Sequence, residues 1–246
     1  MTLHTDPRFQ VVLDKDASSP NPQRAIWTKQ HFCVSEDHRK CARPSETRAG
    51  EIILEHELKG NRGHFSVLDQ AFVSFNAYGF PHSTMTQIRT HASSGLKVLS
   101  QSGRYTGKRF IQVASCEIPN IEDVLFFSPV GTYQDRKGNR YEYTEEQREH
   151  DKMKAYFACV EFSKKVNAGA PYELAREGFP YEFRQDFGFA GTLRSVFHML
   201  LYRSKKDAEE WCQVLAHLTM NELDSYCPEL AGWFREKYFI KGIPGI

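Results

Sequence analysis

The chain has 246 residues, of which 40% are hydrophobic and 13% aromatic, so it can bury a full core and is not a disordered protein. Its formal net charge of +1 gives no whole-molecule argument for binding nucleic acid or a membrane surface. No apolar run approaches the ~18 residues of a membrane-spanning helix, and the first residues lack the apolar core of a secretion signal. We therefore expect a globular protein of the cytoplasm.

The chain begins with a polar segment, followed by regularly patterned elements. Residues 1–45 carry Pro and Ser and should form an extension that is partly loop. Helical spacing of apolar residues predicts a helix over 48–58 with a stop at Gly60. A short helix and then a strand are expected over 65–78.

The middle of the chain alternates between helical and extended patterns. Residues 81–99 should begin as a helix that breaks near the sequence Ser93-Ser94-Gly95. A strand or extended segment is expected over 125–133, and a charged helix over 144–166. Thr144 and Gln147 have the spacing of a capping box, which would fix the start of that helix.

The last third is strongly helical. Residues 190–202 are almost continuously apolar and predict a buried helix. Ser204 should begin the next helix, and Pro228 occupies the first turn of a final one over 229–238. Helices at both ends with strands between them predict the α+β class.

The six cysteines are scattered along the chain, and we interpret them as reduced thiols. Cys33 and Cys41 lie near His31 and His38, a combination of residue types that binds zinc in other proteins. Their spacing matches no standard zinc motif, so we expect no metal site.

The most informative stretch is S-Q-S-G-R-Y-T-G over 100–107, which follows F-P-H-S-T-M-T-Q-I-R-T-H over 80–91. It brings hydroxyls, two glycines and arginines into a short span. Hydroxyls, backbone N–H groups and a forked guanidinium are the groups that bind a phosphate or a planar polar ring. The stretch therefore predicts an anion site.

Three charged or ionisable residues interrupt the apolar segment near its predicted helix: Arg194, His198 and Arg203. A buried arginine is costly unless it is paired with an anion. Three explanations would account for charged residues in this apolar segment. The side chain reaches water at the edge of the helix, it pairs with a carboxylate inside the protein, or it binds an anionic ligand. Arg176 lies four residues before Pro180 and should close a helix, where a cation also satisfies the helix dipole.

Taken together, these segments resemble the flavin-dependent thymidylate synthase family, in the form seen in cyanobacterial members. The resemblance runs from about residue 48 to residue 231. Its blocks are R-A-G-E-I…L-K-G-N-R-G-H-F, the two segments over 80–107, E-L-A-R-E-G-F-P-Y-E-F-R-Q over 173–185, and L-R-S-V-F-H-M-L-L-Y-R over 193–203. Their order along the chain makes chance similarity an inadequate explanation.

The resemblance implies one main domain over 46–246, with a mixed sheet and flanking helices. It also implies a homotetramer whose active sites are built from several subunits. It implies transfer of one carbon from 5,10-methylenetetrahydrofolate to C5 of a pyrimidine nucleoside monophosphate, with FAD as cofactor and NADPH as reductant. A reduced flavin carries such chemistry without a side-chain nucleophile. The sequence agrees, because Ser102 has no evident base beside it and is better interpreted as a phosphate-binding hydroxyl.

The resemblance also assigns residues to the nucleotide. Ser102, Gly103 and Arg104 would hold its phosphate, and Arg89 and Arg176 would also face it. Arg203 would act as the catalytic residue, pointing its guanidinium at the pyrimidine ring to stabilise charge that develops on O2 or O4.

A second set of residues is assigned to the flavin. His64 and Ser66 match positions that contact FAD, while His91 and His198 match positions near its ring or phosphates. Arg194 would support the helix or a contact between subunits.

The sequence departs from the family pattern beside the anion motif. Where the family has Arg-His-Arg or Arg-Thr-His-Arg, this chain has Arg89-Thr90-His91-Ala92. Lys97 would supply a charge in place of the missing arginine, without the fork geometry.

Other departures fall around the flavin and the base. Asp69-Gln70 replaces a Glu-His pair, Thr192 replaces an Asn, and Ala208-Glu209 replaces Ala-Gln. Asp69, Gln70 or Glu209 would suit the amino group of cytosine if they reach it; ordinary sequence drift is the other explanation.

Several functions therefore stay open at this point. The leading hypothesis is an enzyme that converts dUMP to dTMP. The close alternatives are methylation or hydroxymethylation of dCMP or of a ribonucleotide. A non-catalytic nucleotide-binding homologue is a second class. Nucleic-acid binding through Arg104, Tyr105, Lys108, Arg109 and Phe110 is a third, which the near-zero net charge disfavours.

Overall fold

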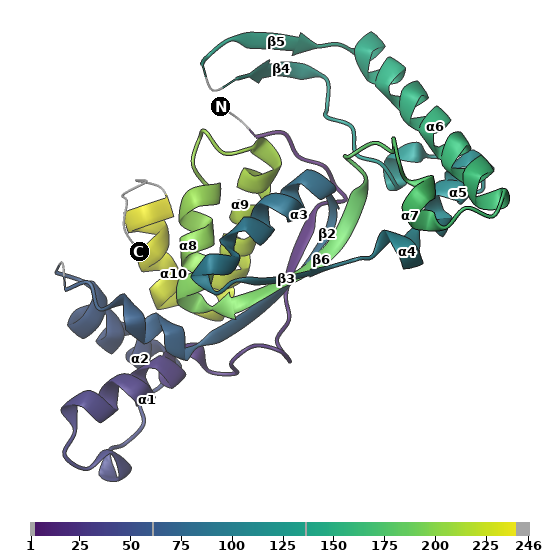
Figure 1. Cartoon of the computed structure of the whole chain (residues 1–246). Helices are drawn as coiled ribbons and strands as arrows, with labels where there is room; N and C mark the ends of the chain where they lie inside the picture. Colours follow the sequence, from purple (N-terminus) through teal and green to yellow (C-terminus); the bar gives the residue numbers. More distant parts are fainter. Residues whose placement is uncertain (1–2, 61, 136, 240–246) are drawn as a thin grey trace.

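A computed structural model describes residues 3–60, 62–135 and 137–239. At its centre is a sheet with the strand order β1-β2-β6-β3, seen edge-on in Figure 1. The strands are β1 (Gln10–Leu13), β2 (Phe72–Pro81), β6 (Arg184–Thr192) and β3 (Lys97–Ser100). The α+β class is confirmed, but the expected mixed sheet is not, because every neighbouring pair is antiparallel. β2 and β3 run in the same direction, yet β6 lies between them and runs opposite to both.

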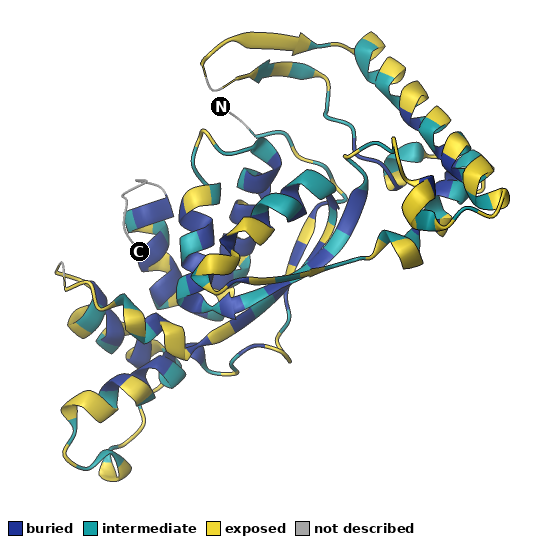
Figure 2. Ribbon diagram, in the orientation of Figure 1, coloured by how far each residue is buried: buried dark blue, intermediate teal, exposed yellow. Residues whose placement is uncertain are grey.

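Helices pack on the strands and form the main core, where Figure 2 shows the buried residues gathered. They are α3 (His82–Arg89), α8 (Leu193–Arg203), α9 (Glu210–Tyr226) and α10 (Pro228–Phe234), followed by the π-helical turn η6 (Arg235–Phe239). Phe75 and Phe189 pair across β2 and β6 with ring centroids 5.2 Å apart, and Phe197 of α8 stacks on Phe234 at 4.2 Å. These aromatic contacts fix the helices against the sheet.

The alternate positions of the strands point outward and leave an apolar surface. The strand register places Val12, Asn76, Gly188 and Leu99 in one row across the sheet. Leu99 is 83% exposed and Val12 46% exposed. Cross-strand neighbours share a face, so this row defines the outer face of the sheet.

A smaller lobe follows the end of β3, with its helices on the right of Figure 1 and its hairpin at the top. It contains α4 (Gly103–Thr106), α5 (Lys108–Ala114), α6 (Glu145–Asn167), α7 (Tyr172–Ala175), and the hairpin of β4 (Gly131–Gln134) and β5 (Arg140–Tyr143). Its own core is formed by the buried residues Phe110, Val113, Val124, Leu125, Ala155, Cys159, Phe162 and Ala175.

The segment before residue 46 contains loops, as expected, but also two elements that the sequence did not reveal. β1 forms an edge of the sheet, and α1 (Pro22–Val34) packs on α2 (Glu46–Ile53). Phe9, Val11 and Trp27 belong to the same core as α8 and β6. No separate core therefore marks a boundary at residue 45 among the described residues.

Several predicted local features are confirmed. The helix over 48–58 is α2 continued by the π-helical turn η2 (Leu54–Leu58), and Gly60 has a φ of +68° just beyond it. The short helix before β2 is the 3-10 segment η3 (Phe65–Gln70). Thr144 and Gln147 form the capping box of α6, with a Gln147 N to Thr144 Oγ1 distance of 3.3 Å.

Two predictions near the C-terminal third were wrong. Ala190, Gly191 and Thr192 continue strand β6 instead of starting the helix, since a buried strand and a buried helix are equally apolar. Ser204 closes α8, donating its N–H to Leu200 O, whereas α9 begins after Glu209. The hydroxyl residue that begins a helix here is Thr192, which accepts from Ser195 N at the start of α8.

One buried arginine connects the two lobes and the N-terminal segment. The Arg184 side chain is 4% exposed and contacts Asp6 Oδ2 at 2.5 Å. It also donates to Glu122 O at 2.5 Å and Gly79 O at 2.7 Å. Pairing on every side offsets the cost of burying this charge.

Candidate functional site

The predicted phosphate-binding residues come together where β3 enters the smaller lobe. Ser102 is the N-cap of α4 and accepts from Arg104 N at 3.4 Å. A Cβ atom added at Gly103 would lie 3.9 Å from Arg176 Nη1, so the end of α7 faces the start of α4. We call Ser102, Gly103, Arg104 and Arg176 the anion cluster.

The anion cluster is open and carries its own counter-charge. The Arg104 side chain is 65% exposed, and its Nε lies 2.5 Å from Glu173 Oε1. Arg89, at the end of α3, donates to Ser100 Oγ at 3.1 Å, next to the cluster in sequence. The structure thus brings together residues from four separate segments; their role toward a phosphate stays a prediction.

Arg203 lies elsewhere, at the end of α8, in a network that holds its guanidinium on several sides. Its Nε donates to His91 Nε2 at 2.9 Å, and its Nη1 donates to Gln87 Oε1 at 2.7 Å. Its Nη2 donates to Gln87 O and to Thr90 Oγ1, both at 2.9 Å. We call these four residues the Arg203 network. Four of the five guanidinium N–H groups are engaged within the described chain, which leaves one on Nη1.

His91 is the neutral partner in this network. Burial, the Arg203 charge and nearby His198 lower the pKa of His91 from 6.5 to about 4. Because Arg203 donates to Nε2, that atom carries a lone pair and the ring proton resides on Nδ1. The His91 and His198 rings lie 5.8 Å apart, and Tyr202 packs 4.8 Å from His198.

His64 and Ser66 lie at the 3-10 segment η3, apart from both groups, and both are exposed. η3 packs against the beginning of α8. There, Asp69 accepts from Thr192 Oγ1 at 2.8 Å and pairs with Arg194 Nη1 at 3.2 Å. Arg194 thus pairs with a carboxylate of its own chain at the surface, and Asp69 binds both Arg194 and Thr192.

A carboxyl network extends the site in a direction that the sequence did not indicate. Glu209 Oε2 accepts from Gln87 Nε2 at 2.5 Å, so the Gln87 amide connects Glu209 to Arg203. Ser83 Oγ lies 3.1 Å from Glu209 Oε1 and 2.8 Å from Glu182 Oε2. The sequence analysis had singled out Glu209, because Ala208-Glu209 stands where the family has Ala-Gln. It had not singled out Glu182.

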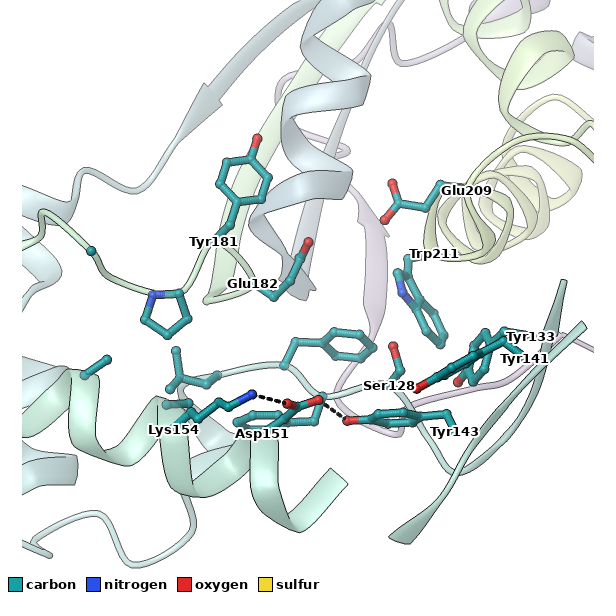
Figure 3. A pocket seen from close by; sticks show the side chains of 17 residues that line it. Ser128, Tyr133, Tyr141, Tyr143, Asp151, Lys154, Tyr181, Glu182, Glu209 and Trp211 are labelled. Carbon is teal, nitrogen blue, oxygen red and sulfur yellow. Dashed lines mark hydrogen bonds and ion pairs between the residues drawn. The ribbon is translucent and has the colours of Figure 1, made fainter. Parts of the chain in front are cut away.

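A cavity with a volume of about 690 Å³ is lined in part by these carboxyl groups. Figure 3 shows Glu182 and Glu209 on one side of it and Asp151 with Lys154 on the other. Glu209, which the sequence analysis considered for an amino group of cytosine, lines it, whereas the residues that the resemblance assigned to the nucleotide or the flavin do not.

Other kinds of site are not supported in the described part of the chain. No group of three or more His, Cys, Asp or Glu side chains is placed to hold a metal ion. No described helix has the length and apolar character needed to cross a bilayer.

Comparison with known proteins decides the family. Residues 14–229 match the family model described as Thymidylate synthase complementing protein. The chain belongs to this family. Its members are the flavin-dependent thymidylate synthases, so the enzyme is a transferase of that type, as the four sequence blocks indicated. A search of the curated proteins gives no match.

Solved structures share the fold of this family member. Thymidylate Synthase X (ThyX) from Helicobacter pylori, solved with FAD and dUMP, is 16% identical with a TM-score of 0.68, covering 93% of this chain and 98% of that one. A second H. pylori ThyX structure complexed with FAD and dUMP is 17% identical with a TM-score of 0.63, covering 89% and 97%.

A methylase has the same fold. The UMP/dUMP methylase PolB from Streptomyces cacaoi, bound with 5-Br UMP, is 14% identical with a TM-score of 0.68. The match covers 97% of this chain and 98% of that one. At such identities the likeness establishes the fold alone.

Proposed function

We propose that this family member transfers a one-carbon unit from 5,10-methylenetetrahydrofolate to C5 of dUMP and forms dTMP, using FAD and NADPH. The observation that carries the proposal is the Arg203 network, in which a fixed guanidinium keeps one N–H free beside a neutral imidazole. The anion cluster supports it with hydroxyl and guanidinium groups suited to a 5′-phosphate. Similar structures hold dUMP or 5-Br UMP.

The residues assigned to the flavin fit that cofactor in their chemistry. His91 and His198 meet edge to face beside Tyr202. The Tyr202 ring is 46% exposed and has Lys205 Nζ 4.5 Å from its centroid. Imidazoles, a flat aromatic face and a nearby cation suit a flavin ring and its phosphates. Exposed Ala92 adds no charge where the family has an arginine.

The chain itself contributes binding, orientation and charge stabilisation. When bound, the flavin supplies the redox chemistry. The free N–H of Arg203 would donate to a pyrimidine carbonyl where negative charge develops. Gln87 and Thr90 keep the guanidinium from turning, so little reorganisation is required during the reaction.

Self-association is part of the proposal. The anion cluster follows the end of β3, whereas His91 of the Arg203 network precedes its start, and we infer that a second chain completes the set of groups meant for one nucleotide. The outer sheet face carries exposed Val12, Phe72, Tyr78 and Leu99, as expected of a face that a second copy covers. We propose a homotetramer in the cytoplasm, where the six free thiols would stay reduced.

The test combines purified protein with FAD, NADPH, methylenetetrahydrofolate and either dUMP or dCMP, and measures product mass. We expect a flavin absorption spectrum, four chains by light scattering, and a methyl group gained on dUMP. Arg203→Gln should lower kcat by roughly 100- to 1,000-fold. Arg203→Lys should have a kcat little above that of Arg203→Gln, because lysine lacks the forked N–H groups of a guanidinium.

The controls separate the alternatives. Arg194→Gln, which removes a surface pair with Asp69, should retain turnover. A mass gain on dCMP only would overturn the dUMP assignment, and a colourless protein that still binds nucleotide would indicate the non-catalytic alternative. One observation keeps dCMP as the second candidate substrate. The Gln87 amide hydrogen-bonds both Glu209 and Arg203, so the Glu209 carboxylate lies near Arg203 and offers an acceptor for an amino group.

A further inference from the structure

The amide of Gln87 determines which hydrogen of the Arg203 guanidinium stays free. Gln87 Oε1 accepts from Arg203 Nη1 at 2.7 Å, and the second N–H of Nη1 is the one left over in the Arg203 network. This arrangement requires the amide oxygen to face the guanidinium. If the amide turned by half a rotation, its N–H groups would face those of Arg203, and two donors form no hydrogen bond.

Glu209 supplies the partner that decides how this amide is oriented. Glu209 Oε2 accepts from Gln87 Nε2 at 2.5 Å. A carboxylate oxygen offers lone pairs and no N–H, so it binds only the nitrogen end of the amide. The oxygen end is thereby directed at Arg203. The carboxylate thus acts on Arg203 through the Gln87 side chain.

The second oxygen of Glu209 is held by a separate contact. Ser83 Oγ lies 3.1 Å from Glu209 Oε1 and 2.8 Å from Glu182 Oε2, and Cys212 Sγ donates to Glu209 Oε2 at 3.7 Å. Burial raises the pKa of both carboxyl groups. A proton taken up by this pair has an acceptor in Ser83 Oγ, so Glu209 Oε2 remains an acceptor for Gln87.

We propose that Glu209 is a positioning residue for Arg203, which fixes the guanidinium by holding the Gln87 amide in one orientation. Ser83 and Glu182 support it by holding the second carboxyl oxygen. The effect on turnover rests on the proposed function, because only there does the free N–H of Arg203 meet a pyrimidine carbonyl. The orientation itself is a property of the protein without any ligand and is measured separately.

NMR of the full chain labelled with 15N-arginine measures how firmly Arg203 is held. A guanidinium fixed in one orientation gives separate Nη1 and Nη2 signals, which exchange when it rotates about its Cζ–Nε bond. We expect slow exchange for Arg203, whose signals are identified by their absence in Arg203→Gln. Arg184 is the internal standard, because Asp6, Gly79 O and Glu122 O hold it in every folded variant.

Substitutions at the start of α9 isolate the role of Glu209. Glu209→Ala should raise the Arg203 exchange rate roughly 10- to 100-fold, since the freed Gln87 amide no longer secures one hydrogen bond of a charged group. Glu209→Gln should retain slow exchange, because its amide oxygen accepts from Gln87 while its amide nitrogen donates to Ser83. The matched control Glu210→Ala removes a neighbouring carboxylate that pairs with His4 Nδ1 at 2.9 Å, and should leave the rate unchanged.

Gln87→Met tests the path from Glu209 to Arg203. It removes the amide and keeps the backbone carbonyl that accepts from Arg203 Nη2. The variant should raise the exchange rate as Glu209→Ala does. Adding Glu209→Ala to Gln87→Met should change the rate by less than about twofold, because both residues act through one contact. If circular dichroism shows that Glu209→Ala is unfolded, Glu209→Leu replaces it, since leucine fills the space without an acceptor.

Steady-state kinetics then measure what the orientation contributes to turnover. Glu209→Ala should lower kcat for dUMP by roughly 10- to 100-fold, because a displaced guanidinium no longer meets the charge that develops on the ring. Its KM should change by less than about threefold, since the anion cluster is untouched. Glu209→Gln should recover most of kcat.

Equal Arg203 exchange rates in the wild type and Glu209→Ala would overturn the proposal, as would fast exchange in Glu209→Gln or additive effects of Glu209→Ala and Gln87→Met. Fast exchange with an unchanged kcat would overturn the effect on turnover. The NMR measurements need neither flavin nor nucleotide. A protein that fails to methylate dUMP therefore contradicts the proposed function and leaves the positioning of Arg203 to be decided by its exchange rate.

Discussion

Arg203 and His91 illustrate how one pair of side chains decides the character of the site. The guanidinium needs acceptors, and the imidazole supplies one only while its Nε2 is unprotonated. Burial and the adjacent positive charge keep it so. The sequence marked both residues, but their direct contact joins segments 112 positions apart and was not predicted.

At this scale we predict a pH-dependent loss of stability. Unfolded His91 takes up a proton below pH 6.5, but folded His91 does so only near pH 4. The contribution of neutral His91 to the free energy of unfolding is therefore fully present above pH 6.5 and is lost as the pH falls toward 4. The loss between pH 7 and pH 5 should be about 2 kcal/mol, measured by urea unfolding at both values.

His91→Gln is the matched control, because glutamine can accept from Arg203 without titrating. The variant should lose correspondingly less stability over the same interval. If wild type and variant lose the same amount, the depressed pKa of His91 has no role in the pH dependence.

At the scale of elements, the turn between η4 (Thr90–Ser94) and β3 positions the His91 segment. Gly95 has a φ of +91°, and a Cβ added there would lie 2.9 Å from Ser195 Oγ. Ser195 Oγ donates to Ser94 O at 2.5 Å and thereby attaches this turn to α8. A predicted helix break at Gly95 is confirmed, but the reason for glycine is this contact as much as the backbone angle.

We predict that Gly95→Ala lowers the free energy of unfolding by about 2–3 kcal/mol, since it combines left-handed strain with a displaced Ser195 hydroxyl. Gly60→Ala is the control: Gly60 has a φ of +68° but no atom within 4 Å of an added Cβ. It should cost about 1 kcal/mol from strain alone. Equal costs in denaturant unfolding would show that the contact with Ser195 contributes nothing.

For the molecule as a whole, the N-terminal segment is part of the fold. Asp6 neutralises Arg184, whose guanidinium also holds Gly79 of β2 and Glu122 of the smaller lobe. Phe9 stacks on Phe80 with ring centroids 4.4 Å apart. The two lobes and the first strand thus meet at one buried cation.

We predict that Asp6→Ala destabilises the protein by roughly 3–5 kcal/mol, because it leaves a buried guanidinium without its counter-ion. Asp123→Ala removes the partner of Arg8, a pair whose Asp123 side chain is 52% exposed, and should cost at most about 1 kcal/mol. Thermal unfolding of both variants compares them. A similar loss in both would mean that burial of Arg184 is not what makes Asp6 important.

The sequence by itself determined the family, the α+β class and most helices, because these depend on local spacing and on motifs read in order along the chain. It also found the capping box of Thr144 and the members of the anion cluster. Tertiary structure decided the antiparallel sheet, the place of β1 in it, and the strand at Ala190–Thr192, since strand pairing joins residues far apart in sequence. Tertiary structure also decided which carboxyl groups are available at the site. Asp69 is paired with Arg194, whereas Glu209 and Glu182 both lie within hydrogen-bonding distance of Ser83 beside a cavity. Neither the pairing of a carboxyl group nor its burial can be read from its position in the chain, because both depend on what the fold places opposite it.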